Sequence, residues 1–348
     1  MNKLQRDRGA GRVKISDVAK AAGVHTSTVS RVLNAKTFGR ISPEVVDRVV
    51  EIARGLGYRP NAVAAGLRTN STGTVGFIVH DIDDPIYPPI LKGIEEALGE
   101  SGLMVLLGNA GYAPEAEAEL LERMAARRID GVVLATARLR DPLVDRCLDY
   151  SLPTVAVVRR PELTVINSVV NDCALGMREI VDLVVSYGHR DIAHIAGPQG
   201  LSTGRERFRG FSDAMSKAGL VPDLRHLRFV DQPTIEAGHA AAGAILDEGE
   251  PRPSVIVCVN DLVAIGAINA CRKKGFDCPG DISITGYNDI PLAGLLNPPL
   301  TTVHMRLQEI GRRTGLRMLA LLSDNNSEIA VERVRPELTL RQSVARIS

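Results

Sequence analysis

The sequence predicts an N-terminal all-α head of helix-turn-helix type with a short hinge helix, followed by two α/β doubly wound lobes. Three observations lead to this fold class. Two short helical patterns flank a glycine within residues 15–34. Positive charge is concentrated in the first 73 residues. From Thr74 onward, short apolar runs alternate with longer amphipathic segments, a pattern typical of βαβ units on parallel sheets.

The length and composition predict several domains with aliphatic cores. At 348 residues the chain is too long for one ordinary domain, and it is 45% hydrophobic but only 3% aromatic. It has no long uncharged apolar run and no signal-peptide pattern at its start, so we expect a cytoplasmic protein. The cysteines lack zinc-site spacing and indicate reduced thiols, and no cofactor or metal is expected. They are Cys147, Cys173, Cys258, Cys271 and Cys278.

The charge is distributed unevenly along the chain. Residues 1–73 hold 13 Lys and Arg against 5 Asp and Glu, a net charge of +8. The remaining residues hold 29 basic and 36 acidic side chains, a net charge of −7. A basic head on an acidic body is typical of a nucleic-acid-binding module attached to another domain. Residues 1–12 are expected to form a disordered basic arm before it.

Residues 13–60 are predicted to form a DNA-binding head. Ser16 is the expected N-cap of its first helix, and Gly23 can adopt the left-handed conformation that ends it. Small and apolar residues fall on one face of each helix; they are Val18, Ala19, Ala22, Val29, Val32 and Leu33. An ordinary helical hairpin with a polar outer face is the alternative. The spacing of the small, glycine and apolar residues favours a helix-turn-helix.

The outer face of the second predicted helix carries His25, Thr26, Ser27, Ser30 and Arg31. All five side chains can form hydrogen bonds, none is acidic, and most are short. Such a face can lie against base edges and phosphates at the same time. This surface is therefore the first candidate functional site.

A third helix and a hinge follow. Ser42 and Pro43 predict the start of the third helix, since serine is a good N-cap and proline is tolerated in the first turn. Residues 61–73 are predicted to form a short hinge helix and linker, too short to be stable alone. A plain linker is the alternative for this segment. Leu67 could act as an apolar wedge in the minor groove of DNA.

These segments resemble the lactose-repressor/galactose-repressor family of bacterial transcription regulators. The resemblance is carried by residues 15–34, by the Tyr-Arg-Pro-Asn junction at 58–61 and by Ala-Val-Ala-Ala-Gly-Leu-Arg at 62–68. It extends from about Val13 to Arg341. It implies a sequence-specific repressor that acts as a homodimer on palindromic operator DNA, under the control of a small-molecule effector.

The resemblance also implies roles for residues of the head. Thr26, Ser27 and Arg31 would read the major groove, and we expect Arg31 to make the strongest base contact, to a guanine. Leu67 of each protomer would enter the minor groove at the centre of the operator. The implied DNA-binding set is Ser16, His25, Thr26, Ser27, Thr28, Ser30, Arg31, Asn34, Asn61, Ala64, Leu67 and Arg68.

Residues 74–348 are predicted to form the effector-binding and dimerisation core. Strands are expected at 75–79, 104–107, 131–135, 154–158, 192–196, 227–230, 254–259 and 282–285. Helices are expected at 88–100, 114–128, 142–150, 174–187, 204–218, 235–248, 262–274 and 306–322. The resemblance, which extends to periplasmic sugar-binding proteins, implies three crossovers near 170–173, 302–305 and 328–333. The first lobe would comprise about 74–170 and 305–329, and the second about 171–304 and 330–348.

Polar side chains that follow the predicted strands are candidates for effector binding. Ligands of parallel sheets bind beyond the carboxyl ends of the strands, so the cleft between two lobes is the expected pocket. The resemblance implies that Tyr87 and Arg207 contact the effector. The full candidate set is Asp81, Tyr87, Thr203, Arg207, Asn260, Asp261 and Asn288. Helix capping is the alternative for Asn260 and Asp261, because both precede a predicted helix.

Three departures from the family pattern leave the effector class open. Asn288 stands where an acid is frequent, Pro233 where an aromatic residue is frequent, and Val158 where an aspartate is common. Arg159 and Arg160 directly follow the strand that ends near Val158. They could receive an anionic group, or they could form a solvated pair in a loop. Both interpretations stay open at this point.

Other classes of protein fit less well. A two-lobed solute-binding protein without a regulatory role would share the body but does not account for the basic head. The sequence has no phosphate-binding glycine loop, no nucleophile elbow and no cluster of metal ligands, so an enzyme is not expected. The segment from Arg335 to the end carries no leucine heptad. A dimer is therefore expected rather than a tetramer held by a C-terminal coiled coil.

Overall fold

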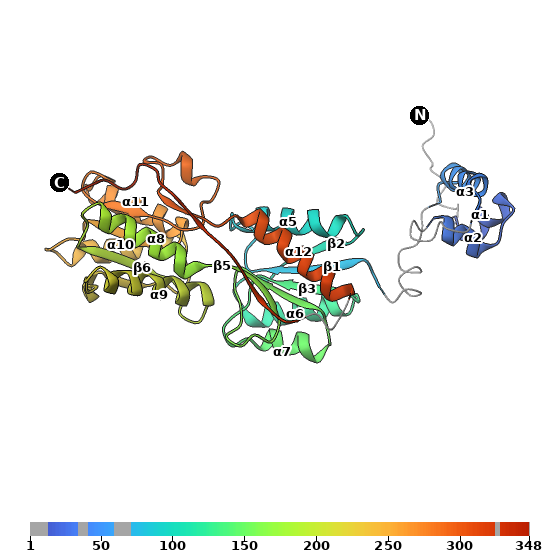
Figure 1. Ribbon diagram of the computed structural model, residues 1–348, viewed down its shortest axis with the longest axis horizontal. Coiled ribbons are helices and arrows are strands. Elements are labelled where there is room, and N and C mark those ends of the chain that lie inside the picture. The colour runs from blue at the N-terminus through green and yellow to red at the C-terminus, as the bar shows by residue number, and fades with distance from the viewer. Residues whose placement is uncertain (1–12, 34–40, 59–70, 324–327, 348) are drawn as a thin grey trace, which may run out of the picture. The chain divides into compact units, whose positions relative to one another are not determined.

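The computed structural model describes residues 13–33, 41–58, 71–323 and 328–347 (Figure 1). The chain divides into two compact units, Met1–Thr72 and Gly73–Ser348. The predicted arm at 1–12 and most of the predicted hinge lie outside the described residues. So do five of the expected DNA contacts, namely Asn34, Asn61, Ala64, Leu67 and Arg68.

The first unit contains three helices, α1 (Ile15–Ala22), α2 (Thr26–Val32) and α3 (Pro43–Gly55). Gly23 ends α1 in the left-handed conformation at φ 65° and donates its backbone N–H to Lys20 O. This geometry is cheap only for glycine, so the turn confirms the prediction. The helices bury a small aliphatic core made of Val18, Ala19, Ala22, Val29, Val32, Val49 and Ala53.

The start of α1 differs from the prediction. Lys14, not Ser16, is the N-cap, and its backbone N–H donates to Asp17 Oδ2 at 2.8 Å. The Asp17 carboxylate also complements the positive end of the helix dipole. Ser16 lies in the first turn of α1 with its side chain exposed, so its hydroxyl is available for other contacts.

The first lobe of the second unit is a six-stranded parallel sheet in the order β11-β5-β4-β3-β1-β2. Its strands are β1 (Thr74–Val79), β2 (Met104–Asn109), β3 (Gly131–Leu134), β4 (Thr154–Val157), β5 (Asn167–Asn171) and β11 (Val331–Val334). Its helices are α5 (Tyr87–Gly99), α6 (Pro114–Ala125), α7 (Pro142–Asp149) and α12 (Leu307–Ser323). In Figure 1, α5 and α12 cover one face of this sheet, and α6 and α7 lie on the other.

Alternation along β1 builds a separate core on each face of this sheet. Phe77 and Val79 belong to the cluster that includes Ile90 and Ile94 of α5. Ile78, between them, joins the cluster of Leu121 and Met124 of α6 with Leu143 and Val144 of α7. The period of two is what a strand buried on both faces requires.

The second lobe has a four-stranded parallel sheet in the order β7-β6-β8-β9. The strands are β6 (Ile192–Ala196), β7 (Leu227–Phe229), β8 (Val255–Cys258) and β9 (Ser283–Thr285). Helices α8 (Cys173–Ser186) and α9 (Ser202–Lys217) pack together, as do α10 (Ile235–Asp247) and α11 (Asp261–Lys273). Short 3-10 helices lie at Leu224–His226 and Ala293–Leu295. An antiparallel pair, β10 (Thr302–His304) and β12 (Glu337–Thr339), completes this part.

Three strands, β5, β10 and β11, lie outside the predicted strand ranges. Residues 330–348 were assigned to the second lobe, but Val331–Val334 pairs with β5 in the first-lobe sheet. Without β11, the backbone of β5 would leave an unpaired edge at this end of the sheet, and β11 satisfies it. The third crossover therefore follows Val334, later than the predicted 328–333. All five cysteines are buried, as expected for inert thiols.

Candidate functional sites

Helix α2 presents a polar surface whose first residues are ordered by its N-cap. His25 Nδ1 accepts hydrogen bonds from the Ser27 backbone N–H at 3.3 Å and from its hydroxyl at 2.8 Å. Because a backbone N–H can only donate, the imidazole proton of this tautomer lies on Nε2. The exposed ring edge of His25 therefore offers a donor, which suits a phosphate oxygen or a base acceptor.

The same helix exposes Ser27 and Arg31 and leaves Thr26, Thr28 and Ser30 half-buried. Val29 and Val32 point into the core, so the polar set is confined to the outer side of α2. No acidic residue lies in α2, and Arg31 stands in its last turn. This surface can donate hydrogen bonds to base edges in the major groove of DNA, which is wide enough for one α-helix.

In the second lobe, Arg207 of α9 is held from several sides. Its Nη1 donates to Val259 O at 2.6 Å and its Nη2 to Asn288 Oδ1 at 3.0 Å. The guanidinium carbon lies 3.8 Å from the centroid of the Tyr287 ring. The structure therefore brings together Arg207 and Asn288, two of the predicted effector residues. Thr203, one turn before Arg207 on α9, is half-buried.

Asn260 and Asp261 serve the fold instead. Asn260 caps α11 by accepting from Val263 N at 2.8 Å, and it donates to Pro233 O at 3.0 Å. Asp261 is 0% exposed, and its two oxygens accept from the Thr302 hydroxyl at 2.5 Å and from Ile290 N at 2.8 Å. Burial raises the pKa of Asp261 to about 6, against the lowering effect of these bonds. The capping interpretation thus accounts for the Asn260 amide, and the fully buried Asp261 carboxylate has both oxygens engaged within the protein.

In the first lobe, polar residues gather where β1 ends. Asp81 Oδ1 accepts from Asp83 N, and Asp84 Oδ1 accepts from Ile86 N, which orders the approach to α5. Burial raises the pKa of Asp84, against the lowering effects of the Ile86 N–H, Arg159 and Arg207. Because Arg207 belongs to the second lobe, its effect on Asp84 places the strand ends of the two lobes within electrostatic reach. Tyr87 is nearly fully buried, and burial raises its pKa to about 12.

Behind Asp84 lies a chain of contacts that the sequence analysis did not identify. Arg159 Nη1 donates to His80 Nε2 at 2.5 Å, and His80 Nδ1 faces Gly111 O at 3.1 Å and Glu117 Oε1 at 3.4 Å. The Tyr112 ring stacks on His80 with centroids 5.2 Å apart. His80 directly follows β1, so the strand-end rule was the signal that could have found it. Glu117 and Tyr112 carried no such signal.

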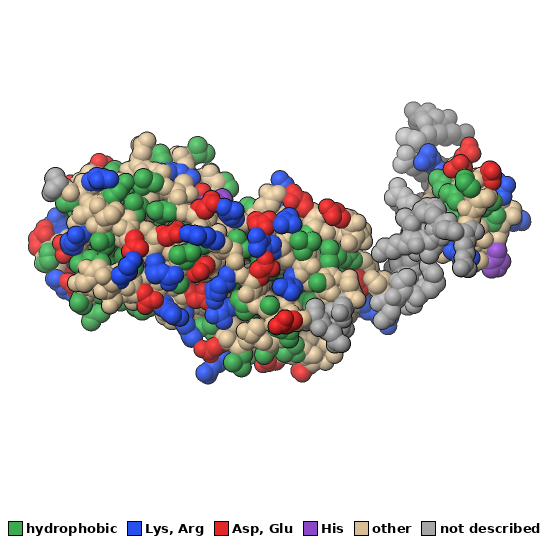
Figure 2. Space-filling model, viewed as in Figure 1, with side chains coloured by type: hydrophobic (Ala, Val, Ile, Leu, Met, Phe, Trp, Pro, Cys, Tyr) green, Lys and Arg blue, Asp and Glu red, His purple; other side chains and the backbone are tan. Residues whose placement is uncertain are grey.

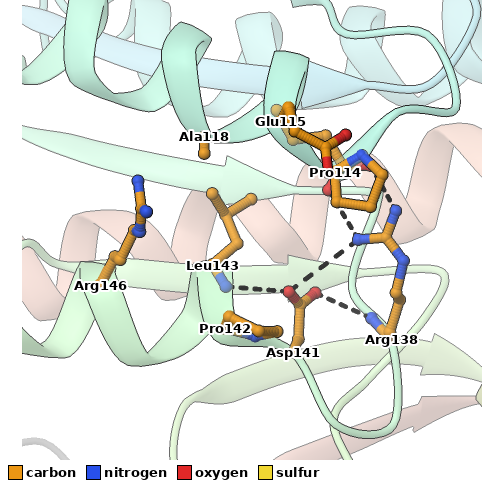
Figure 3. A pocket seen from close by; sticks show the side chains of 9 residues that line it. Pro114, Glu115, Ala118, Arg138, Asp141, Pro142, Leu143 and Arg146 are labelled. Atoms are coloured by element: carbon orange, nitrogen blue, oxygen red, sulfur yellow. Dashed lines mark hydrogen bonds and ion pairs between the residues drawn. The ribbon is translucent and has the colours of Figure 1, made fainter.

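Glu117 is paired on its other side. Arg138 makes two hydrogen bonds of 2.8 Å to the carboxylate of Glu117, which is 0% exposed. Burial would raise the pKa of Glu117, but hydrogen bonds from His80 and Arg138 outweigh it and hold the pKa below its usual value. Beside this pair, a pocket of about 210 Å³ is lined by the starts of α6 and α7 (Figure 3). Arg138 reaches Asp141 there as well, so its charge is compensated within the protein.

Charged contacts also join the two lobes. Glu206 of α9 accepts from Arg160 at 2.9 and 3.2 Å and from Arg333 of β11 at 3.0 and 3.3 Å. Arg160 N donates to Ser202 Oγ at 3.0 Å. Arg160 is therefore engaged in an ion pair with Glu206, which separates it from its neighbour Arg159.

The described residues contain no group of three or more His, Cys, Asp or Glu side chains that could hold a metal ion. Among the same residues, every helix is too short or too polar to cross a membrane. On the face drawn in Figure 2, acidic and basic side chains are interspersed over the described part of the second unit.

Two protein-family models match the chain. Residues 14–61 match the model described as bacterial regulatory proteins of the lacI family. Residues 72–341 match the model of periplasmic binding proteins and the sugar-binding domain of the LacI family.

Curated relatives and solved structures match over almost the whole chain. The HTH-type transcriptional repressor PurR of Pasteurella multocida is 33% identical over 95% of this chain and 98% of its own. The HTH-type transcriptional regulator DegA of Bacillus subtilis is 32% identical over 96% and 98%. The structure of the regulator CelR with cellobiose superposes with a TM-score of 0.74 at 29% identity, over 95% and 100% of the two chains. The operator-bound Lac repressor dimer, at 24% identity over 96% and 100%, shares the fold with a TM-score of 0.85.

Proposed function

Because the chain belongs to the LacI family of bacterial regulatory proteins, we propose that it is a dimeric repressor that binds a palindromic operator through α2. Membership makes the chain a DNA-binding transcription regulator with an effector-binding body, and not an enzyme. The proposal adds three points: which residues contact DNA and effector, that the protein is a dimer, and that it represses transcription. A cytoplasmic location is part of it, since the operator is found there.

The outer side of α2 is the observation that carries the DNA-binding part of the proposal. Its donors and acceptors are exposed on a helix whose apolar side is fixed in a core, which is the arrangement of a recognition helix. Thr26, Ser27 and Arg31 would contact base edges. Ser16, His25, Thr28 and Ser30 would contact phosphates or fix the register, and the expected contacts at 34, 61, 64, 67 and 68 remain part of the proposed set.

The effector site is proposed where the strand ends of the two lobes face each other. Arg207, Asn288 and Thr203 would act from the second lobe, and Asp81 and Tyr87 from the first. Support comes from Arg207, which is held in place by Asn288 and acts on the pKa of Asp84 across the lobes. An effector that contacts both lobes favours one angle between them, and that preference is what couples the site to DNA.

Dimerisation is proposed from the family, of which the Lac repressor is solved as a dimer on its operator. Leu292 and Leu295, 55% and 81% exposed on one short segment of the second lobe, are candidates for part of the contact. Light scattering on the full chain tests the dimer, and a monomer at micromolar concentration contradicts it.

The DNA-binding proposal is tested by selection. The purified full chain is incubated with a random DNA library, and bound sequences are amplified and read. We expect a palindromic site to be enriched, with an affinity that falls steeply as salt increases because bound phosphates release counterions. A non-palindromic pool, or affinity for the selected site that does not change with salt, contradicts the proposal.

A further inference from the structure

The region between the strand ends holds two arginines that lack a carboxylate partner. Arg207 is 5% exposed and Arg159 is half-buried. Within the described ranges, neither guanidinium lies within 4.0 Å of an Asp or Glu oxygen. Removing such charges from water is costly unless an opposite charge is close. Neither arginine is therefore neutralised by a direct ion pair.

Four other partly buried arginines of the second unit are paired. Each has a carboxylate within 2.9 Å, and their side chains are 22–26% exposed. These pairs are Arg138 with Glu117, Arg160 with Glu206, Arg228 with Glu248 and Arg341 with Asp289. Arg178 and Arg317 are half-buried like Arg159 and have no such pair among the described residues, so Arg207, at 5% exposed, is the more unusual of the two arginines between the strand ends.

The hydrogen-bonding capacity of Arg159 is also largely unused. A guanidinium carries five N–H donors, and within the described part of the chain His80 Nε2 takes one of them. His80 is in turn fixed by Gly111 O and Glu117, so it holds Arg159 in one direction. The carboxylate of Glu117 is already engaged by both nitrogens of Arg138 and does not neutralise Arg159.

Asp84 does not form a direct ion pair with either arginine. It lies within electrostatic reach of both, and burial raises its pKa against their lowering effect. Its Oδ1 already accepts the Ile86 N–H. The surrounding rings, Tyr87 and Tyr112, add no negative charge, since a phenol is neutral near pH 7 and burial raises the pKa of both further.

We propose that the effector carries an anionic group, a carboxylate or a phosphate, that binds to Arg159 of the first lobe, with Arg207 of the second lobe adding its positive charge. This inference rests on the proposed function, since it takes the same region as the effector site. His80 acts as a positioning residue for Arg159. A guanidinium that presents free N–H donors to a planar or tetrahedral oxyanion makes bidentate, charge-assisted bonds to it.

The test uses two probes that do not require the natural effector. Thermal unfolding of the full chain is followed at constant ionic strength while chloride is replaced by inorganic phosphate or by acetate. We expect a saturable rise of the unfolding temperature for at least one probe, as binding to the folded state requires. A larger rise with phosphate assigns a phosphate group, and a larger rise with acetate assigns a carboxylate.

Two variants separate binding at Arg159 from general salt effects. Arg159→Gln keeps a donor for His80 and removes the charge, and we expect the half-saturating anion concentration to increase about tenfold or more. Arg123→Gln removes an exposed charge from α6 of the same lobe and should respond like the unmodified protein. The inference is overturned if neither probe stabilises the protein, or if Arg159→Gln responds as the unmodified protein does.

Operator binding is measured on the same samples in chloride, so that the two proposals fail separately. If all three proteins bind the selected palindrome and show no anion response, the anionic effector is rejected and the regulator stands. If none binds any selected DNA, the proposed function is rejected whatever the anions do.

Discussion

Arg207 lies over the face of Tyr287, with 3.8 Å between its guanidinium carbon and the ring centroid. Tyr287 is fully buried, and its hydroxyl donates to Asn171 Oδ1 at 2.8 Å at the end of β5. Asn171 also donates to Val334 O of β11 at 3.1 Å. The proposed effector residue of the second lobe is therefore connected by direct contacts to two strands of the first lobe, at the point where the chain crosses between them.

Replacement of Arg207 is expected to separate effector response from DNA binding. Arg207→Gln loses the stacking on Tyr287 and the charge, so the effector concentration for half-maximal change in operator binding should increase about tenfold or more. The affinity for operator without effector, measured by fluorescence anisotropy, should change less than about threefold. A change of that size is smaller than the loss of one hydrogen bond to a charged group would cause. Arg209→Gln is the matched control, because Arg209 lies on the same helix with its side chain 77% exposed. Equal responses of the two variants would contradict the role given to Arg207.

Arg31 is expected to carry base discrimination. Arg31→Ala should weaken binding to the selected operator by about 1–3 kcal/mol and relax the preference at one base pair of each half-site. Arg31→Lys keeps the charge without the bidentate fork and should recover only part of this loss. Arg54→Ala removes an exposed charge from the last turn of α3 as the control. A uniform loss of affinity over all DNA sequences would instead assign Arg31 to a phosphate.

Glu206 is expected to stabilise the arrangement of the lobes seen in this structure. Glu206→Gln weakens the contacts to Arg160 and Arg333, so this arrangement becomes less favourable and the apparent effector affinity should decrease about three- to tenfold. Glu162→Gln is the control, because its contact to Arg205 also joins the lobes but its side chain is 44% exposed. That variant should change the affinity less than about twofold, as a solvent-exposed ion pair contributes little. Isothermal titration of both variants decides the comparison.

Asp261 is expected to make stability depend on pH in an unusual direction for a carboxylate. Its pKa rises from the usual 3.8 to about 6 on folding, so the folded state binds this proton more tightly than the unfolded state. The resulting stabilisation is complete below pH 3.8 and is lost as the pH rises through about 6. Two pKa units correspond to about 3 kcal/mol, an upper figure for this group.

Asp261→Asn tests this dependence, since the amide can accept from Ile290 N and donate to the Thr302 oxygen. Urea unfolding of both proteins at pH 4.5 and pH 7.5 gives the difference in unfolding free energy between them. We expect that difference to shift in favour of the variant as the pH rises. A difference that stays constant with pH would show that Asp261 titrates equally in both states.

The contact between α5 and α12 should not tolerate a single added methyl group. A Cβ built on Gly311 would lie 2.1 Å from Ile90 O, a backbone atom of the facing helix. Gly311→Ala should therefore force the helices apart and lower the unfolding free energy by about 2 kcal/mol or more. Gly99→Ala is the control, as nothing lies within 4 Å of its Cβ position. We expect that control to be neutral or slightly stabilising, because alanine is the better helix former.

The elements of the fold were largely predictable because they depend on local patterns. The N-terminal ends of α6 and α7 coincide with the predicted residues 114 and 142, since proline at the first helical position sets them. β6 coincides with its predicted range of 192–196, because it is a short apolar run between helices. β5 and β11 were missed or misplaced, because Asn167–Asn171 has polar ends and Glu332 and Arg333 give β11 a polar centre. Their strand character comes from pairing with neighbours distant in sequence: β5 lies between β4 and β11, and β11 pairs with β5.

The sequence by itself determined the class of each part: a helix-turn-helix with a donor-rich outer face, and parallel sheets whose strand ends carry polar residues. Only the tertiary structure decided which of those residues are free to act. Asn260 and Asp261 follow a strand just as Asp81 does, yet Pro233 and Thr302, both distant in sequence, engage their side chains. Arg159 and Arg160 are neighbours in sequence, yet Glu206 engages only Arg160. The reason is physical: a charge is compensated by whatever lies within a few ångströms, and distant segments supply those neighbours.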